Sequence, residues 1–245
     1  KQALEERLPS EGDTDATLLA VDEFSIKKRH QYATTVANVQ TSEVLFVGEG
    51  RDSEALAKFY LKMSSEQREN IQAVAMDMWP AFASATKTFC PNAEIVYDPF
   101  HIIQAFHRDV IDKVRVAEYK KAKKEEKDVI KGSRFLLFKN KENLNDEKGE
   151  PIKLHHLLQL NKRLNTVYIL KDDLKRLWQY KSQWAANNCF DQWYKRAIYS
   201  KIDPLKKFAK TLKRHLPGIL AHCKYPIHTG LLEGINNKIK VIKRI

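Results

Sequence analysis

The chain has 245 residues, of which 43% are hydrophobic and 30% are charged, with only 8 Gly and 8 Pro. This composition predicts a folded protein with a sizeable core and excludes collagen-like repeats and global disorder. The longest apolar runs are too short to cross a bilayer and no signal-peptide pattern opens the chain, so we expect a cytoplasmic protein without a membrane span. The three cysteines have no Cys-x-x-Cys spacing and predict neither a disulfide framework nor a ribbon-type zinc site.

Charge is divided unevenly along the chain. Residues 1–98 hold 10 basic and 16 acidic side chains (net −6), whereas residues 99–245 hold 33 and 15 (net +18). A segregated positive charge is typical of proteins that bind a phosphate polymer, because neutralising phosphates releases condensed counterions. We therefore expect nucleic acid as the partner of the second half, with a solvated lysine-rich helical surface as the alternative.

Ahead of residue 98, short strand patterns alternate with helical ones. The chain begins without Met in a polar lead-in over residues 1–15, and we expect it to be part of a longer protein. Runs rich in Val, Thr, Leu and aromatic residues then predict strands; these runs cover residues 17–24, 32–39, 43–47, 71–76 and 93–97. Helices are expected from an N-cap at Asp52 or Ser53, and from Pro80 to Phe89. The resulting order, βββαβαβα, resembles the ribonuclease-H-like fold.

After Pro99 helical periodicity dominates. An apolar stripe predicts a long helix that runs into a lysine cluster; the stripe consists of Ile103, Phe106, Val110 and Val114. We expect an α/β protein with a mixed five-stranded, ribonuclease-H-like core over residues 16–102. A mostly helical region over residues 103–228, which includes the third core helix at its start, follows this core, and a final helix over residues 229–245 closes the chain.

Two aspartates lie at the ends of predicted strands: Asp22 lies near the end of the first, and Asp77 ends the fourth. A lone aspartate at a strand end is usually a turn former. In a ribonuclease-H-like sheet, however, the first and fourth strands are neighbours, so these carboxylates meet at one edge. Mg²⁺ binds one or two carboxylates together with substrate phosphate and water, and a third acid, for which Glu233 is the natural candidate, suffices for two ions. Two such ions activate a hydroxyl and stabilise the leaving oxygen in phosphoryl transfer.

Other polar residues near these acids have two interpretations each. Glu23 adjoins Asp22, but neighbours on a strand point to opposite faces, and we favour Asp22 as the ligand. Asp98 is either an accessory acid or a turn former before Pro99. His101 either donates to a scissile phosphate or serves the start of a helix. A further group, His215, His222, Cys223 and His228, matches no familiar zinc spacing.

Four short stretches carry these acids or lie beside them. They are Val21-Asp22-Glu23-Phe24-Ser25, Met76-Asp77-Met78-Trp79-Pro80, Asp98-Pro99-Phe100-His101 and Glu233-Gly234-Ile235-Asn236-Asn237-Lys238-Ile239-Lys240. Each is weakly specific alone, but together and in this order they resemble the ISL-three family of bacterial insertion-sequence transposases. The resemblance extends from about Val21 to the end of the chain.

This resemblance implies a DNA transposase catalytic domain that cleaves DNA at insertion-sequence ends and transfers the strand to target DNA. It implies a catalytic and metal-binding triad of Asp22, Asp77 and Glu233, with two Mg²⁺ or Mn²⁺ ions per active site. It also implies that the helical region over residues 103–228 is an insertion into the ribonuclease-H-like core, before the final catalytic helix over residues 229–245. The implied partners are double-stranded DNA, as transposon ends and as target, and a second copy of the chain, since two ends need two active sites. A nucleoid-associated protein of the bacterial cytoplasm is then expected.

Further residues are candidates for contacts with DNA or with the second copy. Cations of the insertion and polar residues of the last helix would contact DNA phosphates; these are Lys120, Lys121, Lys123, Lys124, Asn237, Lys240 and Arg244. An aromatic stretch is a candidate interface between copies, with burial inside the helical region as the alternative; it contains Trp178, Tyr180, Trp184, Phe190, Trp193 and Tyr194.

Two other functions fit the same residues. One is a metal-dependent nuclease or resolvase with the same fold but without strand transfer. The other is a transposase-derived nucleic-acid-binding protein without catalysis. The complete set of three acids argues against a pure binder, because binding alone requires no convergent carboxylates.

Overall fold

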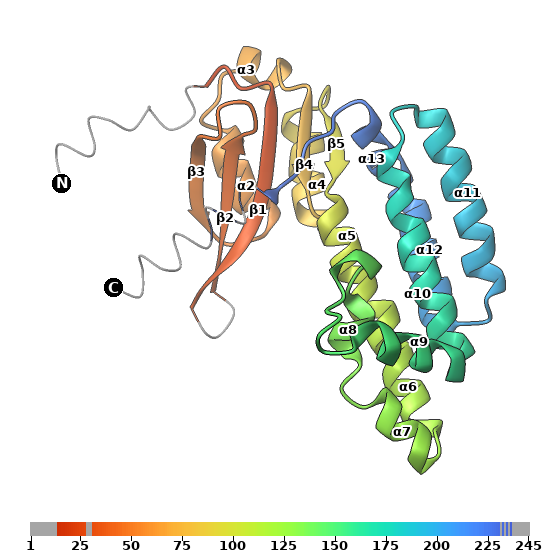
Figure 1. Cartoon of the computed structure of the whole chain (residues 1–245). Coiled ribbons are helices and arrows are strands. Elements are labelled where there is room, and N and C mark those ends of the chain that lie inside the picture. The colour runs from red at the N-terminus through yellow and green to blue at the C-terminus, as the bar shows by residue number, and fades with distance from the viewer. Residues whose placement is uncertain (1–13, 28–30, 231, 233, 235, 237–245) are drawn as a thin grey trace. The chain divides into compact units, whose positions relative to one another are not determined.

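The structure is a computed structural model that describes residues 14–27, 31–230, 232, 234 and 236. The chain divides into two compact units (Figure 1). One unit consists of Lys1–His101 together with Gly218–Ile245, and the other of Ile102–Pro217. No helix in the described part of the chain is both long and apolar enough to cross a membrane.

A mixed five-stranded sheet forms the first unit, as the sequence predicts. Its strands are β1 (Leu18–Lys27), β2 (Gln31–Asn38), β3 (Val44–Glu49), β4 (Ala73–Met76) and β5 (Glu94–Tyr97), in the spatial order β3-β2-β1-β4-β5. The first three strands form an antiparallel meander, whereas β4 and β5 run parallel to β1. The predicted adjacency of the first and fourth strands is therefore confirmed.

Helices α2 (Ser53–Tyr60) and α4 (Pro80–Phe89) pack together behind the sheet in the view of Figure 1. As predicted, Asp52 caps α2 by accepting from the N–H of Ala55 (2.8 Å), and Pro80 occupies the first turn of α4. The hydroxyl groups of Tyr60 and Thr86 lie 2.9 Å apart in the buried contact between the two helices. A third helix, α3 (Ser65–Glu69), was not predicted, although Ser64 and Gln67 form the capping box that begins it.

Small side chains cover the opposite face of the sheet and admit the C-terminal part of the chain. They belong to Ala20, Ala37, Ala73 and Ala75, which form one core cluster with Val96, Ala221, Ile227 and Leu232. Gly218 in α13 (Leu216–Leu220) allows the close approach, since a Cβ atom there would lie 2.6 Å from the ring of Tyr97. After η4 (Ala221–Cys223) the chain turns back across this face, and Gly230, Leu232, Gly234 and Asn236 are helical.

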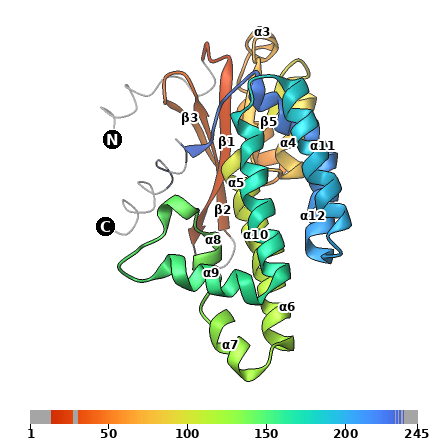
Figure 2. The ribbon, with the colours of Figure 1, turned by 45° about the vertical axis from the view of Figure 1, so that its right-hand side comes forward.

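In the described part of the chain, all the regular secondary structure of the second unit is helical. Its long first helix is confirmed, but α5 (Pro99–Phe106) and α6 (Lys113–Lys121) are joined by the π-helix η1 (His107–Asp112). The remaining elements are α7 (Lys124–Ile130), α8 (Arg134–Phe138), η2 (Lys141–Asn143), α9 (Glu150–Leu160), α10 (Lys162–Lys175), η3 (Arg176–Gln179), α11 (Gln183–Tyr199) and α12 (Asp203–Arg214). Figures 1 and 2 both show α11 and α12 side by side.

Part of the aromatic stretch belongs to the core of this helical unit. Trp193 is buried and its Nε1–H donates to the carbonyl of Leu170 (2.8 Å), while Phe190 is buried against the rings of Trp193 and Tyr194. An interface role is therefore wrong for Phe190 and Trp193, whose apolar area is already used inside the unit. Trp184 is 76% exposed and remains available to a partner.

Candidate active site

Strand register places three acids at one level of the sheet. In the parallel β1–β4 pair Leu18 faces Ala73 and Ala20 faces Ala75, and the same offset sets Asp22 level with Asp77. In the β4–β5 pair Met76 faces Tyr97, so Asp77 is level with Asp98. The predicted meeting of Asp22 and Asp77 at the carboxyl end of β4 thus follows from backbone pairing alone.

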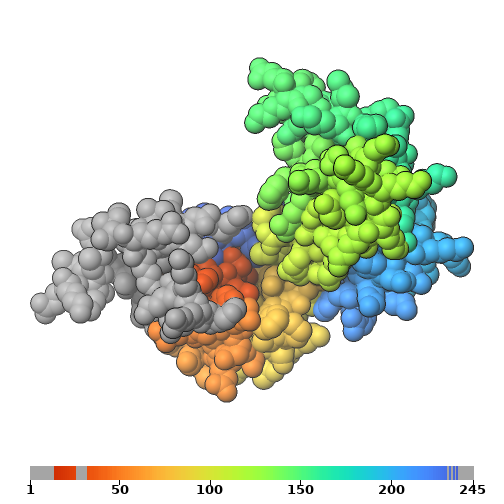
Figure 3. Space-filling model, turned by 90° about the horizontal axis from the view of Figure 1, so that it is seen from below, coloured from red at the N-terminus to blue at the C-terminus, as the bar shows by residue number. Residues whose placement is uncertain are grey.

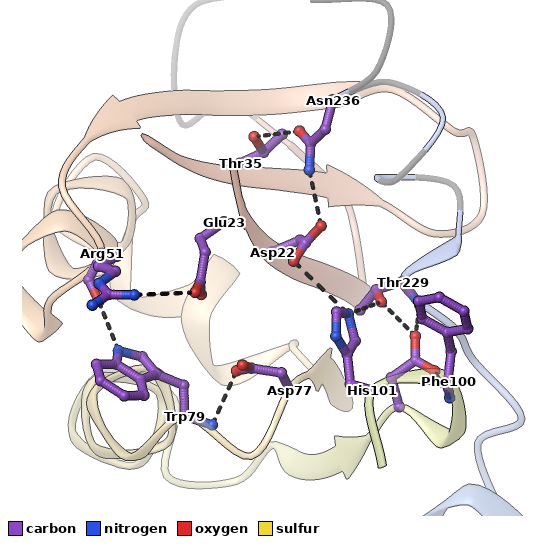
Figure 4. A network of polar contacts seen from close by, with 11 residues as sticks. Asp22, Glu23, Thr35, Arg51, Asp77, Trp79, Phe100, His101, Thr229 and Asn236 are labelled. Carbon is purple, nitrogen blue, oxygen red and sulfur yellow. Dashed lines mark hydrogen bonds and ion pairs between the residues drawn. The ribbon is translucent and has the colours of Figure 1, made fainter. Parts of the chain in front are cut away.

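The carboxyl groups of Asp22 and Asp77 are partly buried, and this burial disfavours their charged forms. Burial is the main cause that raises the pKa of Asp22, and the charge of Asp77 raises it further. Burial also raises the pKa of Asp77, while His101, the backbone N–H of Trp79 and Arg51 act in the opposite direction. Figure 4 shows both carboxyl groups around one space, with His101 beside them. A cation placed in this space would remove the cost of holding both charges.

Asn236 connects the C-terminal segment to Asp22. Its Nδ2 donates to Asp22 Oδ2 (2.9 Å), and its Oδ1 accepts from the hydroxyl of Thr35 (3.1 Å). Thr35 is fully buried and Asn236 is 3% exposed, so the amide orientation is fixed from both sides. Neither residue was singled out from the sequence as a site residue. The signal for Asn236 is its position three residues after Glu233, a spacing that puts two side chains on one side of a helix.

Asp98 anchors the start of that C-terminal segment. It is 1% exposed, and its Oδ1 accepts from the backbone N–H of Phe100 (2.7 Å). Its Oδ2 accepts both the backbone N–H of Thr229 (2.6 Å) and the Thr229 hydroxyl. This carboxylate therefore accepts three hydrogen bonds. It stabilises the turn before Phe100 and holds Thr229 in place. The imidazole of His101 lies between the anchor and the acids, with Nε2 3.2 Å from Thr229 Oγ1 and 3.9 Å from Asp22 Oδ1.

Glu23 is closer to the site than strand alternation suggests. Its Oε1 lies 3.7 Å from Nη1 of Arg51, while its buried Oε2 has no hydrogen-bond partner among the described residues. Burial and the charges of Asp77 and Asp22 raise the pKa of Glu23 to about 7. Three carboxyl groups thus interact here (Figure 4), where sequence reasoning favoured Asp22 over its neighbour.

The donors present fit a hard divalent cation. They are carboxylate oxygens, one of them the orphaned Oε2 of Glu23, and oxygen is what Mg²⁺ and Mn²⁺ prefer. Within residues 14–27, 31–230, 232, 234 and 236, no group of three or more His, Cys, Asp or Glu side chains is arranged to hold a metal ion. Glu233, the predicted third ligand, lies outside the described residues. The rings of His222 and His228 lie 4.9 Å apart, but this pair likewise belongs to no such group in the described chain.

The predicted DNA-contacting residues fall into two sets. Lys120, Lys121, Lys123 and Lys124 are exposed at the end of α6 and the start of α7. The segment formed by α6 and α7 is yellow-green in Figure 3. Asn237, Lys240 and Arg244 lie outside the described residues.

A sheet of this order with acids level on β1 and β4 defines the ribonuclease-H-like fold of the DDE transposases. The ISL3 (ISL-three) family of DDE transposases, described as "Transposase", matches residues 19–245. The chain belongs to this family.

Curated relatives carry the same description. The transposase for insertion sequence element IS1001 of Bordetella parapertussis is 42% identical over 228 residues, which are 92% of this chain and 56% of that protein. The transposase for IS1557 from two strains of Mycobacterium tuberculosis is 26% identical over 250 residues, covering 93% of this chain and 55% of the relative. The chain thus spans about half the length of the curated relatives it matches.

Proposed function

We propose that this chain carries the catalytic centre of an insertion-sequence transposase, which cleaves DNA at the element ends and joins the 3′-hydroxyl to target DNA. The observation that carries the proposal is the pair Asp22 and Asp77, level on neighbouring parallel strands, each with its pKa raised by burial. Membership of the ISL3 transposase family supports it. A DNA substrate implies that the protein works in the bacterial cytoplasm, at the nucleoid.

Asp22, Asp77 and Glu233 would hold two Mg²⁺ or Mn²⁺ ions. When bound, such ions supply Lewis-acid activation of the attacking hydroxyl and charge stabilisation of the leaving oxygen. The chain's own groups prepare this site. Asn236 donates to one oxygen of Asp22 and so holds the carboxylate in one orientation. Asp98 fixes Thr229, and thereby the start of the segment that continues to Glu233.

Removing any one of the three acids tests the proposal. Asp22→Asn, Asp77→Asn and Glu233→Gln should each reduce Mg²⁺- or Mn²⁺-dependent cleavage of labelled element-end DNA by at least about a hundredfold. Folding of the Asp22 and Asp77 variants should survive, because neutralising a carboxyl group whose charge is disfavoured by burial leaves the apo protein as stable as before or more so. The exposed Glu66→Gln on α3 is the matched control. Full activity in any of the three variants contradicts that residue's assignment.

Two alternatives are decided by the products of the same reaction. A nuclease or resolvase yields cut ends without joined product, whereas a transposase yields target DNA covalently linked to the element end. A binding protein without catalysis yields neither, while it still shifts the labelled DNA in a binding assay. The close acidic pair favours the two catalytic readings, since binding to a polyanion gains nothing from adjacent carboxylates.

A further inference from the structure

Arg51 follows β3 in a turn that is fixed by its neighbours. Gly50 has a positive φ of 99°, which a side chain would strain. The Gly50 N–H donates to the carbonyl of Tyr32 (2.8 Å), and its own carbonyl accepts from the hydroxyl of Thr34 (2.9 Å). The indole Nε1–H of Trp79 donates to the carbonyl of Arg51 (2.8 Å). Contacts from β2 and from the chain after β4 therefore set where the Arg51 side chain starts.

Two aromatic rings then hold the guanidinium group. The Arg51 Cζ lies 4.1 Å from the ring centroid of Tyr32 and 5.1 Å from that of Trp79. Both distances are in the range of attractive cation–π contact. Since a side chain already ordered loses less entropy when a ligand binds, this arrangement preorganises the planar fork of the guanidinium. The side chain is still 40% exposed, so a ligand can reach it.

The ion pair with Glu23 does not explain why the Arg51 side chain is held in place in this way. At 3.7 Å it is longer than a good charge-assisted hydrogen bond, and partly exposed pairs of this kind contribute little to stability. The charge of Arg51 is nevertheless felt inside the site, because it lowers the pKa of both Glu23 and Asp77. Figure 4 shows Arg51 and Trp79 on one side of the acids, and His101 with Thr229 on the other.

We propose that Arg51 binds a backbone phosphate of the DNA strand that reaches the acids, on the side of Glu23 and Asp77. The proposal rests on the proposed function, because a DNA strand must approach this edge of the sheet. Three carboxyl groups repel such a strand, and a preordered cation beside them offsets the repulsion. A guanidinium offers two parallel N–H donors to a phosphate, and the weakly held Glu23 is the partner that the phosphate replaces.

Binding of a short fluorescent DNA duplex in EDTA, measured by anisotropy over a salt series, tests this contact apart from catalysis. Arg51→Met keeps an apolar stem between the rings and removes the charge. It should weaken binding about tenfold at low salt and reduce the slope of log K against log salt by about 1. Arg51→Lys should keep the slope but bind about threefold more weakly, because it lacks the fork. The control is Lys58→Met, an exposed cation on α2 of the same unit, for which no such loss is expected.

The outcomes separate the two proposals. An unchanged slope and affinity in Arg51→Met, in a protein with wild-type thermal stability, overturns the phosphate contact even if the wild type cuts DNA with Mg²⁺. If Arg51→Met is unstable, Arg51→Lys alone is the test. Wild-type affinity of Arg51→Lys for DNA then contradicts a contact that uses the two parallel N–H donors of the guanidinium. Conversely, wild-type protein that binds DNA through Arg51 but never cleaves it with Mg²⁺ or Mn²⁺ contradicts the proposed function and leaves the contact standing.

Discussion

The amide of Asn236 joins residues from three parts of the chain. It donates to Asp22 on β1 and accepts from Thr35 on β2, while it belongs itself to the C-terminal segment. The ionised carboxylate of Asp22 can only accept, so the amide nitrogen faces it, and the amide oxygen then accepts from the hydroxyl of Thr35. Residues that orient a metal-binding carboxylate in this way typically change metal affinity or activity by about 10- to 100-fold when they are removed.

Asn236→Ala should therefore raise the Mg²⁺ concentration needed for half-maximal cleavage by about tenfold or more. Thr35→Val should have a smaller effect in the same direction, because the amide stays but loses its fixed orientation. Asn161→Ala is the control, since Asn161 also makes a side-chain hydrogen bond to an acid, Glu118, but within the helical unit. A Mg²⁺ titration of cleavage measures all three variants. Unaltered Mg²⁺ dependence in Asn236→Ala would show that Asp22 is oriented by other groups.

At this scale the sequence predicted residues whose position follows from local pattern. Asp22 lies within the run that forms β1 and Asp77 directly after the run that forms β4, so the fold type was enough to bring them together. Asn236 and Arg51 were missed because their contacts depend on tertiary structure. Asn236 is separated from Asp22 by 214 residues along the chain, and Arg51 meets Trp79 across 28. Glu23 was underrated because strand alternation gives the direction of a side chain but not how far a flexible one reaches.

Among the elements, the π-helix η1 carries a partly buried imidazole at its first position. The ring of His107 stacks on that of Phe138 with centroids 4.4 Å apart and planes 4° apart. Burial, followed by the charges of Lys171 and Lys175, lowers the pKa of His107 from 6.5 to about 4. The Lys171 ammonium is itself buried, donates to the carbonyls of Leu137 (3.1 Å) and Lys139 (2.6 Å) at the end of α8, and cannot move away. The folded helical unit therefore holds His107 neutral.

This arrangement predicts a loss of stability in mild acid. Above about pH 6.5 His107 is neutral in both the folded and the unfolded chain, so it costs nothing. As the pH falls from about 6.5 toward 4, His107 binds a proton in the unfolded chain but stays neutral in the folded chain. The free energy of unfolding therefore decreases. For this partly exposed ring we expect a loss of about 1 to 2 kcal/mol.

His107→Phe should abolish that part of the pH dependence while keeping the stack on Phe138. Urea unfolding at about pH 7 and about pH 5, followed by circular dichroism of the helices, measures it. The exposed His155→Phe on α9 should behave as the wild type. An equal loss between the two pH values in His107→Phe and wild type would assign the acid sensitivity to another group.

Element boundaries followed from the sequence where caps and periodicity agree. The strands, the Asp52 cap and the Pro80 start were predicted because each is decided by neighbouring residues. The π-helix was not, since a run of apolar residues at helical spacing fits either geometry. Nor does a run of aromatic residues reveal which of them are buried: Trp193 packs inside the unit and Trp184 on the same helix is exposed.

For the whole molecule, the uneven charge predicts an affinity for DNA that falls as the salt concentration rises. Replacing Lys120, Lys121, Lys123 and Lys124 by Gln should reduce the slope of log K against log salt by about 3 to 4, if each neutralises one phosphate. All four are exposed, so the substitutions should leave the fold intact. Gln at the exposed Lys58 and Lys87 of the sheet unit serves as the control and should change the slope less. If the fourfold replacement leaves the slope of log K against log salt unchanged, the four lysines form a solvated surface that does not bind DNA.

Coordinated cutting of two element ends further predicts two copies of the chain in one complex. Light scattering should find at least a dimer on paired end DNA. Trp184→Ala, which removes an exposed aromatic side chain of α11, should weaken that assembly without altering the stability of the monomer. A single chain bound to paired ends rules out the dimer, and a dimer that tolerates the substitution moves the interface elsewhere.

The sheet unit is assembled from two stretches that are separated in sequence by the whole helical unit. Contacts that complete the acidic edge join residues 131 and 214 positions apart, namely Asp98 with Thr229 and Asp22 with Asn236. On a ribosome, the strands that carry Asp22 and Asp77 emerge long before these partners. Under the proposed function, a nascent chain exposes the lysines proposed to bind DNA before the proposed catalytic site is complete. We therefore predict that a chain truncated before Gly218 binds DNA without cleaving it, because the segment that supplies the partners of Asp98 and Asp22 is missing.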